Sequence, residues 1–246
     1  LGGELTYSSF EVQPGRFVFH DPVVVKKKDT TLSAETLSID YAWHWSERTL
    51  NVLVAVEKLH VKWGEGEMDF HPFLHRSRSS SPFHIDGKVI VNEGLLDLIP
   101  AKRKDPIHFG GEITLGKEPQ GDFHMAFAKD STFSGHFQSA LEGEINLDLA
   151  LNQVPVRESM ELLHKFMPHT WLWKGEEGKF NGRLKISILP HALPEAEGKI
   201  VIEKLKMFHP QLGIHASIEE AMLYVEPLAS NTMETRWQRS FMPQCS

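Results

Sequence analysis

The chain has 246 residues, 41% of them hydrophobic, which allows one large domain or two small ones. Its formal net charge is -7 and its acidic and basic residues are mixed along the sequence, so no basic stripe could follow a phosphate backbone and no nucleic-acid partner is expected. The only cysteine, Cys245, excludes an intrachain disulfide and a cysteine-based metal site.

The first 63 residues predict a set of short strands. The sequence alternates from Leu5 to Val25 around a turn at Pro14, with Phe17 and Phe19 on one face, and Asp21 followed by proline ends this run. Two further alternating runs, 32–45 and 50–63, are joined by polar residues and predict a hairpin. Because residues 1–7 already have this strand pattern, we expect the chain to be a piece of a longer one.

Between residues 64 and 82 the alternation fails. The stretch 71–82 is rich in serine, arginine and proline, which is typical of a mobile surface loop. This segment is therefore the expected boundary or insertion.

From residue 83 to residue 228 a repeated unit dominates the sequence. A glycine, a charged residue and then alternating apolar side chains occur at Gly87, Gly111, Gly143, Gly182 and Gly198. We expect these glycines to open each strand in a tight turn or bulge, because glycine adopts positive φ without a Cβ penalty. The pattern predicts a meander in which each strand pairs antiparallel with its sequence neighbour.

One helix is predicted, over residues 156–167, with Pro155 in its first turn and Pro168 ending it. Residues 229–246 lose all periodicity and read as a frayed tail. One short helix cannot cover so wide a sheet, so its apolar face must be shielded by curling, by a second sheet or by something other than protein. The predicted fold is therefore mainly all-β: a long curled antiparallel meander with one short helix.

No metal site is expected from the histidines. His108, His124 and His136 alternate with apolar residues and are predicted to lie on the opposite, wet face. His71 and His75 have helical spacing but flank a proline in the predicted loop. Trp171 and Trp173, near the end of the helix, are predicted to pack in the core or at an edge, with a headgroup boundary as the alternative.

Catalytic arrangements are not expected either, so the sequence predicts neither an enzyme nor a cofactor. Asp130, Ser131 and His136 are close in sequence but lack a nucleophile elbow. The adjacent pairs 176–177 and 219–220 are glutamates whose side chains point to opposite sides of a strand. The glycines at 110–111 lack the spacing of a phosphate-binding loop.

Together these motifs resemble those of the AsmA-like proteins of Gram-negative envelopes, over about residues 5 to 226. The resemblance lies in segments 32–41, 56–61, 87–98, 111–115, 154–163, 178–186 and 198–207. It implies a periplasmic body, tethered to the inner membrane by an N-terminal anchor outside this chain, whose sheet rolls into an apolar trough. Such proteins are thought to carry phospholipid between the inner and outer membranes.

Burial of an acyl chain gains about 0.8 kcal/mol per CH₂, so a trough lined by bulky apolar side chains would bind lipid without fixed polar partners. The residues predicted to line it are Val89, Val91, Ile113, Leu115, Phe123, Met125, Phe127, Ile145, Leu147, Leu149, Leu184, Ile186, Ile188, Ile200 and Ile202. Periodicity alone leaves open that the same residues close a dry sandwich core. The rival function is a structural or outer-membrane assembly factor whose sheet edge pairs with a strand of an outer-membrane protein.

Overall fold

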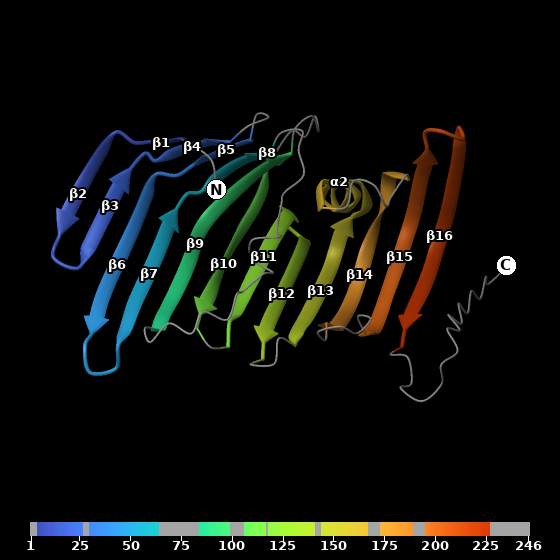
Figure 1. Ribbon diagram of the computed structural model, residues 1–246. Helices are drawn as coiled ribbons and strands as arrows, with labels where there is room; N and C mark the ends of the chain where they lie inside the picture. Colours follow the sequence, from blue (N-terminus) through green and yellow to red (C-terminus); the bar gives the residue numbers. More distant parts are fainter. Residues whose placement is uncertain are drawn as a thin grey trace.

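The computed structural model describes residues 4–26, 30–63, 84–98, 106–116, 118–140, 144–166, 173–188 and 195–226. These residues form one open sheet of sixteen strands and a short helix (Figure 1). The strands are β1 (Glu4–Thr6), β2 (Ser9–Gln13), β3 (Arg16–His20), β4 (Val23–Lys26), β5 (Thr30–Ser33), β6 (Thr36–His44), β7 (Thr49–Glu57), β8 (His60–Trp63), β9 (His84–Leu98), β10 (Ile107–Leu115), β11 (Gln120–Ala128), β12 (Ser131–Ser139), β13 (Ile145–Pro155), β14 (Lys174–Ile188), β15 (Glu195–His209) and β16 (Ile214–Val225). The helix is α2 (Val156–Phe166).

The predicted curled sheet with one short helix is confirmed, and from β9 to β16 every strand pairs antiparallel with its neighbour. Pairing with sequence neighbours fails before β9, because β1 pairs with β4, β3 with β6, β5 with β8 and β7 with β9. Both β7 and β8 run parallel to β9. The strands before residue 64 and those after residue 83 therefore share one sheet. The antiparallel prediction was wrong here because β9 begins at His84 opposite Thr49, at the end of the sheet from which β7 also starts.

A line of backbone irregularities crosses the sheet, and we call it the crease. Asp21, Lys58, Glu93, Gln153 and Lys204 have φ values of 47°, 51°, 53°, 51° and 50°. Each lies between two stretches of strand. Glu93, Gln153 and Lys204 each fall where β9, β13 or β15 has one residue more than the strand it pairs with, as in a β-bulge. At Asp21 and Lys58 the paired strands advance by equal numbers of residues. Bulges bend strands, so a bulge repeated in strand after strand folds the whole sheet along one line.

The apolar alternation changes phase at these positive-φ residues. On one face of β7 the apolar side chains stand at even positions: Val52, Val54 and Val56. After Lys58 the apolar side chains stand at odd positions: Leu59, Val61 and Trp63. The same change occurs across Glu93 in β9 and across Gln153 in β13. Each shift keeps the apolar side chains on one face after the bend. We call this the inner face and the opposite one the outer face.

On one side of the crease lies a short upper wall, made of β1, β4, β5, β8 and the end of β9, along the upper margin of Figure 1. On the other lies the long wall, formed by the remaining strands. The two walls meet over a cluster of buried side chains: Val61, Trp63, Leu96, Leu98, Ile107, Phe127 and Val154. We call this the crease cluster.

The helix α2 takes the place of the upper wall over the C-terminal strands. Val156 is fully buried and Met160 nearly so, and both pack beside Leu205 of β15. A Cβ at Gly175 of β14 would lie 2.7 Å from Cγ1 of Val156, so glycine lets the helix sit directly on the sheet. Trp173 packs against this cluster and meets His209 edge-on, as predicted for core or edge packing.

Polar contacts hold the outer side of the crease. The backbone N–H of Lys58 donates to the carbonyl of Asn92, and Nδ2 of Asn92 donates to Oε1 of Glu57 at 2.7 Å. Glu35 accepts a hydrogen bond from the Lys58 ammonium and raises its pKa. Further along, Asn181 accepts from the backbone N–H of Gln153 at 2.7 Å. The backbone N–H groups of Lys58 and Gln153 are thus satisfied although they lie at irregular positions of the sheet.

The prediction that glycines open the strands was wrong. Gly87, Gly111, Gly182 and Gly198 lie inside β9, β10, β14 and β15, with their Cα atoms paired across the ladder. Gly182 and Gly198 do have positive φ, 151° and 148°, but in mid-strand. Local alternation cannot show which strands approach one another so closely that a side chain has no room.

Several predictions lie outside the described residues. They concern the 64–82 loop with its histidines, Gly143, Trp171, the last residue of the predicted helix and the 229–246 tail. The helix otherwise begins at the predicted residue.

The candidate binding face of the sheet

The pairing registers place apolar residues in straight rows across the strands of the long wall. The first row outside the crease cluster contains only apolar residues and glycine: Phe10, Phe19, Leu37, Val56, Val91, Gly111, Phe123, Gly135, Leu149, Leu184, Gly198 and Val225. The second row runs parallel to it: Val12, Phe17, Ile39, Val54, Val89, Ile113, Gly121, Phe137, Leu147, Ile186 and Ala196. At about 4.8 Å per strand the first row is about 50 Å long.

The described part of the chain leaves this face partly open. Ile113, Leu115 and Leu223 are 40%, 39% and 42% exposed, whereas the side chains of the crease cluster are below 10%. A scattered exposed leucine needs no explanation, but a contiguous apolar face of this length is a candidate binding surface. The described strands form one sheet, so no second sheet of a dry sandwich covers the rows.

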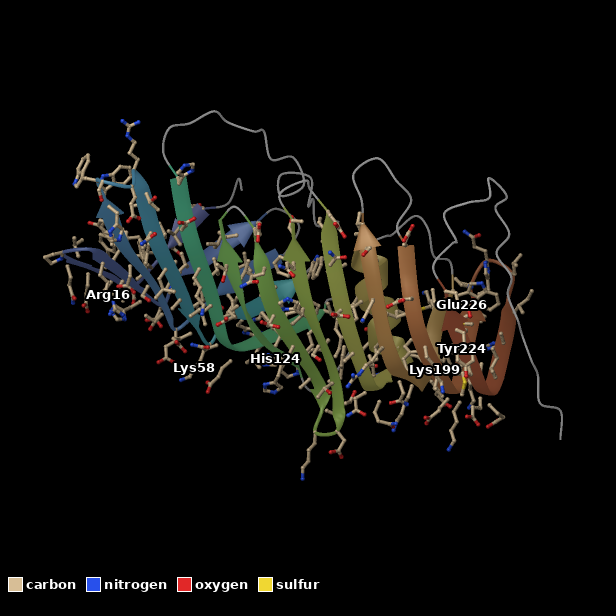
Figure 2. The ribbon with its side chains drawn as sticks, turned by 90° about the horizontal axis from the view of Figure 1, so that it is seen from below. Arg16, Lys58, His124, Lys199, Tyr224 and Glu226 are labelled. Carbon is tan, nitrogen blue, oxygen red and sulfur yellow. The ribbon has the colours of Figure 1, made fainter. Side chains whose placement is uncertain are left out.

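The outer face is polar. Ion pairs and hydrogen bonds link neighbouring strands there, including Lys88–Glu112 at 2.8 Å and His136–Asp122 at 2.9 Å. In Figure 2, His124 and Lys199 project from the same side of the sheet as Lys58, which carries the Glu35 contact. The two faces thus differ in chemistry along the whole sheet, and the predicted outward orientation of these histidines is confirmed.

Most of the predicted lining residues fall together on the inner face. Val91, Phe123, Leu149 and Leu184 belong to the first row, and Val89, Ile113, Leu147 and Ile186 to the second. Leu115, Met125, Ile145, Ile188, Ile200 and Ile202 lie on the same face in flanking rows. Phe127 differs, since it is 5% exposed inside the crease cluster and supports the bend instead of lining the open face.

The sequence reading missed the N-terminal half of the face. Apolar residues of β2, β3, β6 and β7 extend both rows to the opposite edge of the sheet. These residues already showed period-two alternation, but only the register across β7 and β9 places them in line with Val89 and Val91. That parallel pairing joins segments on either side of the 64–83 connection.

This N-terminal part is aromatic. Phe10 lies 4.6 Å from Phe19 and 5.9 Å from Phe17 between ring centroids, and Phe17 stacks on Tyr41 at 5.2 Å. The corresponding positions of β13 to β15 carry leucine, isoleucine, alanine or glycine. The N-terminal end of the face is therefore aromatic and its C-terminal end aliphatic.

Polar groups that could perform chemistry do not converge in the described structure. Ser131 donates its hydroxyl to the backbone carbonyl of Gln153 at 2.8 Å, while His136 contacts Asp122. Glu177 pairs with Lys206 at 2.6 Å, and the Lys206 ammonium lowers the pKa of the Glu177 carboxyl. The carboxyl of the adjacent Glu176 lies 3.5 Å from Nδ1 of His215 instead. Within the described ranges, no three histidine, aspartate or glutamate side chains gather as metal ligands would.

A shallow depression on the outer face, between β12 and β15, is lined by charged and amide side chains. Its groups already have partners: Ser187 donates to Asn146, and Lys185 lies 3.8 Å from Glu197. The depression is therefore a weaker candidate than the inner face.

A scan against models of known protein families finds no match, and a search of curated proteins finds none. Among the described helices, none has the length and apolar character needed to cross a membrane.

Proposed function

We propose that the inner face binds the acyl chains of lipids, and that the chain is a lipid-carrying segment of an envelope protein. The observation behind this proposal is a pair of apolar rows on a partly open face, the first running unbroken from β2 to β16 and the second from β2 to β15. An acyl chain needs apolar contact along its length and no hydrogen-bond partner. Each buried CH₂ contributes about 0.8 kcal/mol, so the affinity of such a face for an acyl chain increases with the length of the chain and needs no polar contact.

The direction of the rows also fits a lipid-carrying role. A closed pocket would hold a ligand at one place, but both rows begin at the edge strand β2, and the first continues to the edge strand β16. A bound chain can therefore shift from strand to strand without leaving apolar contact. The resemblance to AsmA-like proteins supports phospholipid as the cargo, carried in the periplasm between the inner and outer membranes.

The proposal is tested by extracting lipid from the purified chain, expressed in a Gram-negative host, and by uptake of a fluorescent fatty acid. We expect co-purified phospholipid and saturable uptake. Leu147→Glu should abolish most uptake, because it places a carboxylate in the second row between Phe137 and Ile186.

The matched control is Ala150→Glu, on the same strand but on the outer face, where its neighbours in register are Ser134 and Arg183. This variant should bind like the unmodified chain. Absence of phospholipid together with absence of fatty-acid uptake would reject the proposed function, as would equal loss in the two variants.

The rival proposal is strand addition at the edge. β16 has 12 residues without lysine or proline, and Met222 and Tyr224 on its outer face are 42% and 63% exposed. Lysine or proline usually protects natural edge strands, so this edge could accept a further strand. Replacing both side chains by lysine should block strand addition but leave fatty-acid uptake unchanged.

A further inference from the structure

The inner face changes character where β10, β11 and β12 cross it. Three of the positions that these strands contribute to the two rows are glycine: Gly111 and Gly135 in the first row and Gly121 in the second. Glycine inside a strand weakens it unless something needs the space of the missing side chain. At Gly121 and Gly135 that space is filled by aromatic rings from neighbouring strands, whereas at Gly111 it is filled by the backbone of β11.

The ring of Phe123 lies directly over Gly135. A Cβ built at Gly135 would be 2.4 Å from Cζ and 2.6 Å from Cε1 of Phe123, and 2.9 Å from Cδ2 of Leu149. Phe137 covers Gly121 in the same way, with its Cε1 2.5 Å from the position of a Cβ. Both rings therefore lie down on the backbone of the adjacent strand, an arrangement known to rescue glycine in sheets.

A reclining ring leaves more open space above the sheet than a ring that stands upright. On one side of this section the crease cluster packs against Phe109, Met125 and Phe133. On the other side Ile113 and Leu115 are about two-fifths exposed. The glycine-seated rings thus form a lowered floor between the packed crease and the open side of the face.

We propose that this floor, Phe123 and Phe137 seated on Gly135 and Gly121, is the section over which a linear acyl chain crosses the middle of the sheet. It rests on the proposed lipid function and specifies where on the face the chain lies. Gly135 is a positioning residue, because its missing side chain keeps the Phe123 ring down. A flat aromatic floor has no fixed polar group and lets a methylene chain slide across it.

Gly135→Ala tests this assignment selectively. The atoms that a Cβ would meet all belong to side chains, so the backbone can stay in place while the Phe123 ring is forced upward. The double variant Gly135→Ala with Phe123→Ala removes the raised ring and should restore the open floor. Gly87→Ala is the control, since the nearest atoms to a Cβ there lie 3.5 Å away.

The readout is a fatty acid carrying a diazirine, photoactivated when bound, with its adducts mapped on peptides by mass spectrometry. In the unmodified chain we expect adducts in β10–β12 as well as in β6–β7 and β13–β15. Gly135→Ala should reduce adducts in β10–β12 several-fold and leave the other sections unchanged. The double variant should recover them, and Gly87→Ala should behave like the unmodified chain.

Adducts elsewhere but not in β10–β12 of the unmodified chain would overturn the floor assignment and leave the lipid function standing. A folded Gly135→Ala protein with the same β10–β12 adducts as the unmodified chain would also overturn the floor assignment. If Gly135→Ala does not fold, the adduct map of the unmodified chain still decides the location. Absence of adducts everywhere would instead reject the proposed function itself.

Discussion

Glycine shapes the inner face in two ways at the scale of single residues. At Gly135 and Gly121 its missing side chain makes room for an aromatic ring. At Gly182 and Gly198 it lets two backbones approach, because a Cβ would lie 2.1 Å and 2.2 Å from a carbonyl oxygen of the facing strand. Glycines of the second kind permit local bending that residues with a Cβ would resist.

Gly198→Ala should therefore destabilise the chain by about 2 kcal/mol or more, because the new Cβ meets the carbonyl of Arg183 and φ is 148°. Urea unfolding followed by circular dichroism measures the change. Gly87→Ala, which meets no atom closer than 3.5 Å, should stay within about 0.5 kcal/mol of the unmodified chain. Equal unfolding midpoints for the two variants would contradict the assigned role of Gly198.

The sequence showed the repeated glycines but not their purpose. Alternation around Gly111 indicates that Ile113 and Leu115 share a face with it, and this held in the structure. What glycine does there depends on β11, whose Asp122 carbonyl would lie 2.4 Å from a Cβ. Such close approach is a property of two paired strands and is not encoded in either alone.

At the scale of elements, the bulges decide the form of the sheet. The apolar alternation changes phase at Lys58, at Glu93 of β9 and at Gln153 of β13, where the chain crosses the crease. The signal was present in the sequence, since the apolar positions change from even to odd along 52–63. Reading 50–63 as one uninterrupted strand concealed it. A single inserted residue is easily lost among short alternating runs.

The helix α2 closes the crease where no upper-wall strand reaches. Met160 is 8% exposed and packs with Val156 and Leu205, so Met160→Ala should cost about 2–5 kcal/mol through lost contacts and the cavity left behind. Urea unfolding tests this directly. Arg157→Ala, on an exposed position of the same helix, is the control and should be nearly neutral. A Met160→Ala protein as stable as this control would show that the helix does not hold the crease.

At the scale of the whole molecule, a bent sheet creates a chemical difference between its two sides. Among the described residues, the clusters of almost wholly inaccessible apolar side chains lie along the crease and beneath α2. Beyond them the long wall keeps a partly exposed apolar face, while ion pairs occupy its outer face. An open apolar face is costly in water, and this cost is the physical basis of the proposed lipid binding.

The central claim is that lipid contacts one face of this sheet from end to end. It is tested most directly by a photoreactive amino acid placed at Val56, Leu149 and Leu223, and at their outer-face neighbours Ala55, Ala150 and Met222. After illumination in cells, mass spectrometry detects lipid adducts. We predict adducts at all three inner positions and none at the outer ones. Equal labelling of both faces, or no lipid adduct at any inner position, would contradict the account.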